Sequence, residues 1–339
     1  MRFSDRLTAA WYQPRLTPLT AALWPLSLLF GVAVAARRLA YRTGALRAAA
    51  VGVPVIVVGS IVVGGTGKTP LARALAAALR ERGRRPGLVA RGYGGSNTAP
   101  RAVAAGDDPA EVGDEPPLYV TDGFPVWIGH DRLAAARALL AAHPECDTVI
   151  ADDGLQHYAL ERDFEIAVID ETRGLGNGCL LPAGPLREPR RRLDAVDAVV
   201  VLAAQGSTPA AARGNRQSVM RYEPLPWRNL ARPDATAEPS AWRRGPVHAV
   251  AGIGHPARFF ALLRGLGLDP VCHPFPDHHR YTAEELRFPG AVAVLMTQKD
   301  AVKCARFADA RFWYLPIAAR IDPALIERVT RTIRGPQAA

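Results

Sequence analysis

A glycine-rich segment followed by Lys and Thr carries the clearest chemical signal in this 339-residue sequence. Residues 59–70 read GSIVVGGTGKTP, and glycines in such a turn let backbone N–H groups approach phosphate oxygens. The Lys68 ammonium then reaches the terminal phosphates, and the Thr69 hydroxyl can ligate Mg²⁺. Only three of the 42 Lys and Arg residues are Lys, so a Lys here indicates a chemical requirement. The segment predicts a nucleoside triphosphate site, with these residues around the phosphates: Gly64, Gly65, Thr66, Gly67, Lys68, Thr69 and Pro70.

The segment also departs from the usual phosphate-loop pattern. The pattern G-x-x-x-x-G-K-[ST] has Gly where this chain has Val62, and a related ATPase class has Lys where this chain has Val63. The standard switch GTPases and the signature-lysine ATPases therefore both fit less well than another branch of P-loop proteins.

Two acids follow an apolar run and suit a metal. Asp152 and Asp153 come directly after 147–151, and an Asp at such a strand end holds the Mg²⁺ that bridges nucleotide phosphates. The alternative is a surface turn begun by Asp-Gly. We predict the metal role, and we expect Gln156 and His157 to position a substrate or water.

Several loops carry further candidates for acid–base chemistry and anion binding. Asp114 and Glu115 lie in the turn 113–116, where acids beside Gly and Pro more often cap or solvate a turn. The cationic segment 91–95 suits an anionic or sugar-containing substrate, or simply forms a turn. The candidates for binding substrate or phosphate are Arg91, Tyr93, Glu115, Arg132, Gln156, His157 and Arg187.

Two motifs lie near the C-terminus. Residues 276–281 read PDHHRY. Neighbouring His side chains on a strand point to opposite faces and no Cys lies at ligand spacing, so one His acting with a carboxylate is predicted rather than a metal site. Residues 297–300 read TQKD, which resembles loops in which an Asp accepts a hydrogen bond from a nucleotide base.

These residues need a scaffold, and the apolar pattern predicts an α/β fold. Apolar strands alternate with helical runs at 69–82 and 131–142, which is typical of a mostly parallel sheet with helices on both faces. A Pro-rich stretch precedes a second, smaller α/β lobe. The expected strands of the first part are 54–59, 86–90, 125–128, 147–151, 164–170 and 197–202. The expected domains are 1–48, a membrane-associated helical segment; 49–210, a P-loop kinase domain; 211–245, a linker or ribbon; and 246–339, the C-terminal lobe.

The N-terminal segment suits a membrane surface. Residues 1–50 hold seven Arg against a single Asp, and an apolar run over 16–36 lies between them. A single spanning helix and an interfacial amphipathic helix whose arginines contact anionic lipid are both compatible with this pattern, and we favour the second. A cleaved signal peptide fits poorly, because the apolar run starts late. Of the formal charge of +10, +6 lies in residues 1–50. Because this basic excess coincides with the apolar segment, it does not indicate nucleic acid binding. Four scattered Cys point to a reducing compartment.

Taken in order, the motifs resemble one family, the tetraacyldisaccharide 4′-kinases of lipid A biosynthesis in Gram-negative bacteria. The resemblance covers roughly residues 10 to 330 and rests on the ordered set rather than on any one motif. Ser60 stands where Asn is common in the family, and Gln298 where Glu is common. The matching segments are 64–70 (GGTGKTP), 91–94 (RGYG), 113–116 (GDEP), 152–157 (DDGLQH), 182–188 (PAGPLRE), 277–278 (DH) and 297–303 (TQKDAVK).

The resemblance implies a kinase at the cytoplasmic face of the inner membrane, and we expect a monomer, although the sequence does not give the oligomeric state. It would use ATP and Mg²⁺ to phosphorylate the 4′-hydroxyl of tetraacyldisaccharide 1-phosphate, an acylated disaccharide lipid, to give lipid IVA. It also implies that Asp114 is the base, that His278 orients it, and that Arg187 and Arg132 bind phosphates. The residues alone leave alternatives open: a metallochaperone-type GTPase, a soluble small-molecule kinase, or a membrane-anchored nucleotide sensor.

Overall fold

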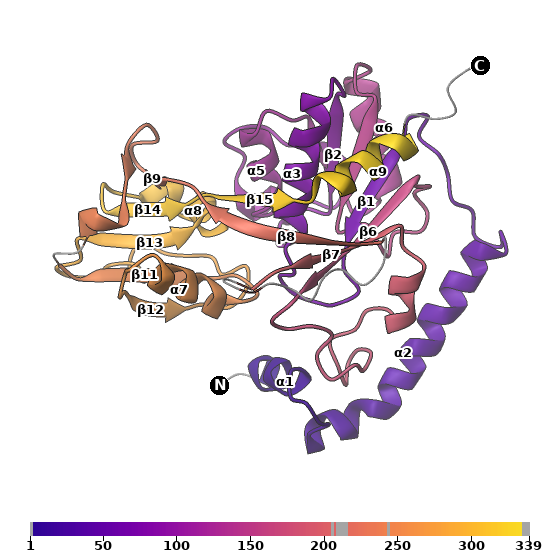
Figure 1. Cartoon of the computed structure of the whole chain (residues 1–339), viewed down its shortest axis with the longest axis horizontal. Coiled ribbons are helices and arrows are strands. Elements are labelled where there is room, and N and C mark those ends of the chain that lie inside the picture. Colours follow the sequence, from indigo (N-terminus) through magenta and orange to yellow (C-terminus); the bar gives the residue numbers. More distant parts are fainter. Residues whose placement is uncertain (1–2, 205–206, 208–215, 243–244, 334–339) are drawn as a thin grey trace.

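The protein has two α/β units preceded by two N-terminal helices (Figure 1). The computed structural model describes residues 3–204, 207, 216–242 and 245–333. We call the part built on the nine-stranded sheet the first unit and the part built on the six-stranded sheet the second unit. The helices are α1 (Phe3–Trp11), α2 (Pro18–Arg42), α3 (Lys68–Glu81), α4 (Pro109–Val112), α5 (Pro116–Thr121), α6 (Arg132–Ala142), α7 (Pro256–Gly265), α8 (Gln298–Cys304), α9 (Pro323–Ile333) and the 3₁₀ turns η1 (Arg190–Asp194), η2 (Pro239–Trp242) and η3 (Ala305–Phe307).

The first unit confirms the predicted parallel sheet. Its strand order is β15-β8-β7-β6-β1-β5-β2-β4-β3, and all neighbours are parallel except the two edge pairs β15–β8 and β3–β4. Each strand expected from the apolar runs of this unit is present within one residue of its expected ends. The bounds are β1 (Val55–Gly59), β2 (Pro86–Ala90), β3 (Arg101–Ala102), β4 (Val126–Ile128), β5 (Thr148–Asp152), β6 (Phe164–Asp170), β7 (Ala198–Leu202), β8 (Gln217–Pro224) and β15 (Ile317–Ile321).

The second unit is inserted between β8 and β15. Its strand order is β10-β9-β14-β13-β11-β12, with β12, β11, β13 and β14 parallel and β9 and β10 antiparallel to their neighbours. The predicted lobe 246–339 therefore differs from the sheet membership, because β15 and α9 return to the first unit. The predicted linker 211–245 supplies β8, β9 and β10; its residues 211–215 and 243–244 lie outside the described residues. The bounds are β9 (Trp227–Asn229), β10 (Thr236–Ala237), β11 (Val247–Ala251), β12 (Val271–Pro274), β13 (Ala293–Thr297) and β14 (Phe312–Leu315).

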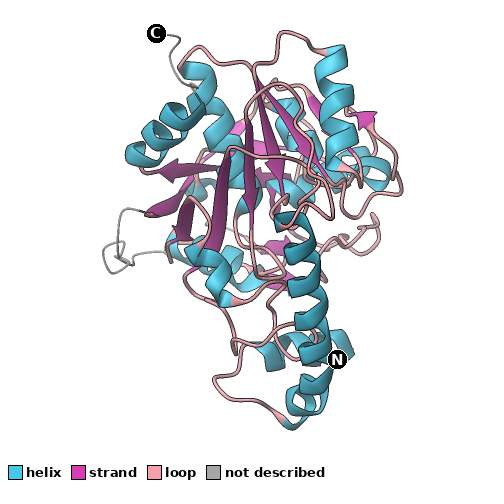
Figure 2. Ribbon diagram, turned by 90° about the vertical axis from the view of Figure 1, so that its right-hand side faces the viewer, coloured by secondary structure: helices cyan, strands magenta, loops and turns pink. Residues whose placement is uncertain are grey.

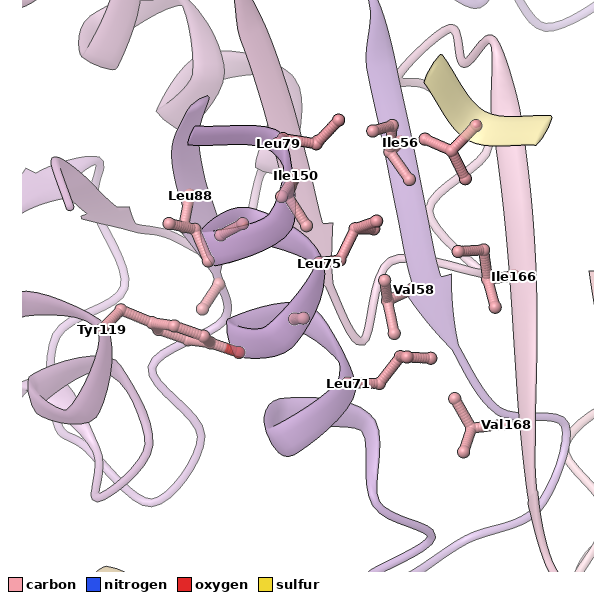
Figure 3. Packing of buried hydrophobic residues seen from close by; sticks show 14 of the residues in the cluster. Ile56, Val58, Leu71, Leu75, Leu79, Leu88, Tyr119, Ile150, Ile166 and Val168 are labelled. Carbon is pink, nitrogen blue, oxygen red and sulfur yellow. The ribbon is translucent and has the colours of Figure 1, made fainter. Parts of the chain in front are cut away.

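Helix α3 fixes the phosphate loop on the sheet. Leu71, Leu75 and Leu79 recur every four residues and lie on one helix face. They point toward Ile56 and Val58 of β1 (Figure 3), and all five side chains are fully buried. The alternate β1 residues pack on the other face of the sheet, so the strand is buried on both sides, as expected of a central parallel strand. The loop that joins β1 to α3 is therefore held at both ends by core packing.

Helix α2 runs along the outside of the first unit (Figure 2). Thr17 caps it in a capping box with Thr20. It is the one helix in the described part of the chain that is long and apolar enough to cross a membrane by length and composition. Two polar residues, Thr20 and Ser27, face the protein, while Leu29 and Val32 are each 68% exposed. An apolar face is therefore left open to the surroundings.

Candidate active site

The phosphate loop has the backbone that its glycines predict. Gly64 and Gly67 have φ values of 98° and 95°, which favour glycine, and a Cβ on Gly67 would lie 2.9 Å from the Tyr222 hydroxyl. Val62, which stands where the usual pattern has Gly, is buried and forms a bridge with Leu186. The departure from the pattern thus serves packing against the segment that carries Arg187.

Asp152 lies at the end of β5, directly behind the loop. The hydroxyls of Thr69 and Tyr119 both donate hydrogen bonds to its Oδ2, at 3.0 and 2.5 Å. Its Oδ1 is buried and has no hydrogen-bond partner among the described residues. Burial, together with the charge of Glu115, raises the pKa of Asp152 to about 6. A carboxylate oxygen left unpaired beside the Thr69 hydroxyl fits a divalent cation, which would supply the missing positive charge.

Asp153 has different partners from Asp152. Its backbone adopts a φ of 49°, and its carboxylate lies 2.9 Å from Arg187 Nη1 and 3.6 Å from Lys68 Nζ. Burial would raise the pKa of Asp153, but the charges of Lys68 and Arg187 outweigh it and lower the value to about 2. Asp153 is therefore held ionised by cations, whereas Asp152 has a free oxygen.

Asp114 and His278 form a pair across the two units. Asp114 Oδ1 lies 2.8 Å from Nδ1 of His278, and the acid is almost fully buried. Burial would raise the pKa of Asp114, but the hydrogen bond with His278 and the charges of Lys299 and Lys303 hold it below the ordinary range. His278 has a φ of 60°, an arrangement that non-glycine residues rarely adopt and that often marks functional sites.

Two further candidates, Tyr93 and Glu115, lie beside this pair. The Tyr93 ring meets the His278 ring edge-on, with centroids 4.7 Å apart. Glu115 accepts a hydrogen bond of 3.1 Å from Lys299, so it holds a cation rather than an anion. Arg91 is exposed, on the same loop as Tyr93.

Arg132, Gln156 and His157 lie behind the phosphate loop instead. Arg132 is buried, and it donates hydrogen bonds to the carbonyls of Gly129 and His130, both at 3.2 Å. Burial lowers its pKa to about 10. Gln156 bonds to Glu188, and His157 Nε2 accepts the backbone N–H of Arg132. Arg132 also donates to the Asp153 carbonyl, and Gln156 accepts from Arg187, both at 3.4 Å. These contacts support the loops that carry Asp153 and Arg187, and the direct substrate role of the three residues stays a prediction.

A cavity of about 370 Å³ joins these groups. Its polar lining includes the phosphate loop, Asp153, Arg187, Tyr93 and His278. Its lining also includes apolar side chains, which suit the flat face of a nucleotide base. The apolar side chains are Ile253, Phe259, Leu262, Leu315 and Ile317.

The base-accepting role expected of Asp300 is wrong, although Thr297, Gln298 and Lys299 of the same segment line the cavity. Asp300 is fully buried and accepts hydrogen bonds from the backbone N–H of Gly252 and the hydroxyl of Tyr281, at 3.2 and 3.1 Å. Lys303 Nζ lies 2.8 Å from the same carboxylate. Since these partners occupy Asp300, it does not reach a nucleotide base.

Sequence reasoning did not assign a role at this site to four residues, which the structure places there. Tyr119 contacts Asp152 from 33 positions away, and no local pattern marks it. Lys299 and Lys303 both approach Asp114, and the scarcity of Lys was the signal that could have found them. Asp170 binds Arg258 of the second unit at 2.7 Å and thereby joins the units beside the cavity.

The chain is similar to known proteins along most of its length. The family model described as Tetraacyldisaccharide-1-P 4′-kinase matches residues 19–334. The tetraacyldisaccharide 4′-kinase of Alkalilimnicola ehrlichii is 54% identical over 314 residues, covering 92% of each chain. That of Azoarcus sp. is 49% identical over 328 residues, covering 96% of each. A crystal structure of LpxK from Aquifex aeolicus in complex with ATP matches with a TM-score of 0.79 and 27% identity, over 93% of this chain and 99% of that one.

The match spans both units and α2, so it covers the whole cavity rather than the phosphate loop alone. The rival sequence interpretations, a GTPase and a nucleotide sensor, are not favoured by any of these relatives. The chain belongs to the tetraacyldisaccharide-1-P 4′-kinase family, which confirms the resemblance, the α/β P-loop fold and the ATP-dependent phosphotransferase activity predicted from the sequence.

Proposed function

We propose that this chain transfers the γ-phosphate of ATP to the 4′-hydroxyl of tetraacyldisaccharide 1-phosphate, giving lipid IVA, and that Asp114 accepts the hydroxyl proton. The observation that carries the proposal is the contact between Asp114 and His278, because His278 lines the cavity that Lys68 and Asp153 also line. A kinase needs a carboxylate near the attacking hydroxyl and cations near the phosphates, because its transition state is loose and negatively charged.

The roles follow from position. Lys68 and the loop amides would bind the phosphates, and Arg187 would bind a phosphate of donor or acceptor. His278 would orient Asp114 and keep one of its oxygens occupied, so that the other faces the proton. Because His278 belongs to the second unit, the site is complete only when the units are docked, which also excludes water.

Thr69 and Asp152 would hold Mg²⁺, with Asp153 nearby. The unpaired Oδ1 of Asp152 and the Thr69 hydroxyl that bonds its other oxygen support this assignment. When bound, Mg²⁺ would neutralise part of the charge on the phosphates. Asp153 is paired with Arg187 and Lys68, which favours a role in holding those cations.

We further propose that α2 lies flat on the cytoplasmic face of the inner membrane and does not span it. A 25-residue helix is about 37 Å long, enough to span. However, Ser27 at its middle accepts the Ala183 N–H at 2.9 Å and donates to the Leu180 carbonyl at 2.8 Å. Near its end, the Tyr41 ring packs on Tyr158. A helix held along its length to the protein exposes only its outer face to lipid.

This placement explains how a lipid reaches the cavity. The loop that binds Ser27 continues into Arg187, whose backbone N–H donates to the Ile61 carbonyl beside the phosphate loop at 2.7 Å. The acyl chains would stay in the bilayer next to α2 while the sugar reaches Asp114. The Arg residues around α2 would contact anionic lipid. One chain supplies every group in this scheme, so we expect a monomer.

The test is transfer of ³²P from [γ-³²P]ATP to tetraacyldisaccharide 1-phosphate in detergent micelles with Mg²⁺. We expect labelled lipid from the wild type and none from Lys68→Ala or Asp114→Ala. Release of phosphate without labelled lipid would instead identify an ATPase and remove the lipid kinase proposal.

A further inference from the structure

All three lysines of the chain lie at the active site. The other basic residues among the 42 are Arg and are spread over the molecule. Lys68 opens α3 in the first unit, whereas Lys299 and Lys303 lie one turn apart on α8 of the second unit (Figure 1). The fold therefore brings together the few places where the sequence uses an ammonium in place of a guanidinium.

Lys299 is held in the cavity by three carboxylates. Its Nζ lies 3.1 Å from Glu115 Oε1, 3.6 Å from Asp277 Oδ1 and 3.9 Å from Asp114 Oδ2. The same atom is 3.5 Å from Nε2 of His278. Burial would lower the pKa of Lys299, but these carboxylates outweigh it and raise the pKa above its ordinary value. The ammonium is therefore charged and fixed beside the catalytic pair.

Lys303 also contacts Asp114, but its other partners differ from those of Lys299. Its Nζ lies 2.8 Å from Asp300 and 3.7 Å from Asp114 Oδ2, and it lies over the Tyr281 ring at 5.1 Å. Lys303 lines a second cavity, of about 560 Å³, which Asp114 and His278 also line, and it does not line the first. Lys299 lines the first cavity together with Lys68. Both lysines lower the pKa of Asp114. Only Lys299 lines the cavity that contains the phosphate loop.

We propose that Lys299 is a further catalytic residue, whose ammonium contacts the transferred phosphoryl group opposite Lys68. This rests on the proposed function. In that reaction the 4′-hydroxyl oxygen bonds to the γ-phosphorus, and the bond from this phosphorus to the β,γ-bridging oxygen breaks. ADP leaves with that electron pair, and the hydroxyl proton passes to Asp114.

The charge of this transition state explains the placement of Lys299. Negative charge spreads over the three equatorial oxygens of the phosphoryl group, and a cation brought from a second element stabilises it. Lys68 approaches from the first unit and Lys299 from the second, beside the base. Glu115 and Asp277 hold the ammonium in place before the substrates arrive. Docking of the second unit thus delivers a positive charge as well as His278.

The experiment compares Lys299→Ala with Lys303→Ala over a range of pH. On the proposal, Lys299→Ala lowers kcat by about 10²- to 10³-fold at every pH, and leaves the Kd for ATP within about threefold, since the contact forms mainly in the transition state. Lys303→Ala removes a cation that faces Asp114 together with His278 and Lys299. Its removal raises the pKa of Asp114, so activity is lost at low pH and returns as pH rises.

Two other results of the same pH series would contradict the proposal. If Lys299 acted only by keeping Asp114 ionised, Lys299→Ala would behave as Lys303→Ala does, and raising the pH would restore its rate. An unchanged kcat for Lys299→Ala would overturn it as well. A wild type that labels no lipid would remove the proposed function itself, whatever the Lys299 variants do.

Three further variants separate an effect of charge from an effect on folding. Lys299→Arg keeps the charge and Lys299→Gln does not, so the first is expected to retain at least tenfold more activity than the second; equal rates would count against the proposal. Lys299→Ala removes a cation that three carboxylates share, so Glu115→Gln combined with Lys299→Ala serves as a variant with less repulsion. It should keep the wild-type melting temperature and still show the loss in kcat.

Discussion

His278 Nδ1 lies 2.8 Å from Asp114 Oδ1, although the two residues are 164 positions apart and belong to different units. The contact makes the base of the first unit depend on the position of the second. Removing either side chain should therefore affect the chemical step more than the binding of ATP.

We expect His278→Asn to lower kcat by about 10²- to 10⁴-fold, the usual range for acid–base groups. Asn tolerates the positive φ of 60° at this position, so the backbone is preserved while the imidazole is lost. The Kd for ATP should change by less than threefold. His279→Ala is the matched control, because His279 contacts Glu285 at 3.1 Å instead of Asp114. A His279 variant as slow as the His278 variant would contradict the assignment.

Tyr119→Phe should weaken metal binding. The hydroxyl of Tyr119 holds one oxygen of Asp152 and leaves the other free, and loss of such a supporting bond usually costs about 10- to 100-fold in metal affinity. The measurement is Mn²⁺ binding in the presence of ATP, followed by electron paramagnetic resonance. Tyr158→Phe, which loses a bond to Glu188, should bind Mn²⁺ as the wild type does. Equal affinities for the wild type and Tyr119→Phe would show that Thr69 alone orients Asp152.

The pH dependence of stability should report the contact between Asp170 and Arg258. Burial would raise the pKa of Asp170, but the His255 imidazole 3.6 Å away, the hydrogen bonds from Thr172 and the charge of Arg258 lower it to about 2. The ionised form is thus favoured in the folded state. This stabilisation, about 2 kcal/mol, is complete above about pH 4 and disappears as pH falls through about 2. Asp170→Asn should lower the free energy of unfolding at pH 6 and flatten its decline between pH 4 and 2, as measured by urea unfolding.

The control for Asp170 is an acid of similar charge on the surface. Asp309 pairs with Arg311, and both side chains are more than 36% exposed, so Asp309→Asn should change the free energy of unfolding little. If the free energy of unfolding declined less steeply between pH 4 and 2 in both Asp170→Asn and Asp309→Asn, the effect would arise from net charge. It would then not report the contact between the units.

The outer face of α2 should determine binding to membranes. Leu29→Arg combined with Val32→Arg places charges at two side chains that are each 68% exposed. We expect at least a tenfold loss in partitioning to anionic phospholipid vesicles, since burying one such side chain is worth about 1.5–3 kcal/mol. Activity on substrate in detergent micelles should remain. Leu225→Arg changes an exposed apolar residue away from α2 and should not alter vesicle binding; if it does, binding is not specific to α2.

The strands and the phosphate loop could be predicted because their signals are local. Val55 to Val58 form an apolar run that ends in a Gly-rich turn. A continuous apolar run of this kind is enough to predict a buried parallel strand. The position of the helix 323–333 could not be predicted in the same way. Its apolar periodicity indicates a helix but not which sheet it covers, and Leu325 and Val329 in fact pack on the first sheet. Contacts such as that of Tyr119 with Asp152 depend on tertiary structure alone.

The return of β15 and α9 to the first unit has a consequence for synthesis on the ribosome. The roughly 90 residues between β8 and β15 take on the order of 5 to 20 s to translate, at about 5–20 residues per second. During this time β8 is an unpaired edge, and the core positions opposite Leu325 and Val329 are uncovered. The second unit is one continuous segment, 227–315, so it can fold as soon as it emerges. The part of the protein that is translated first is therefore the last to be finished, and the nascent chain needs protection from aggregation until residue 333 has left the exit tunnel.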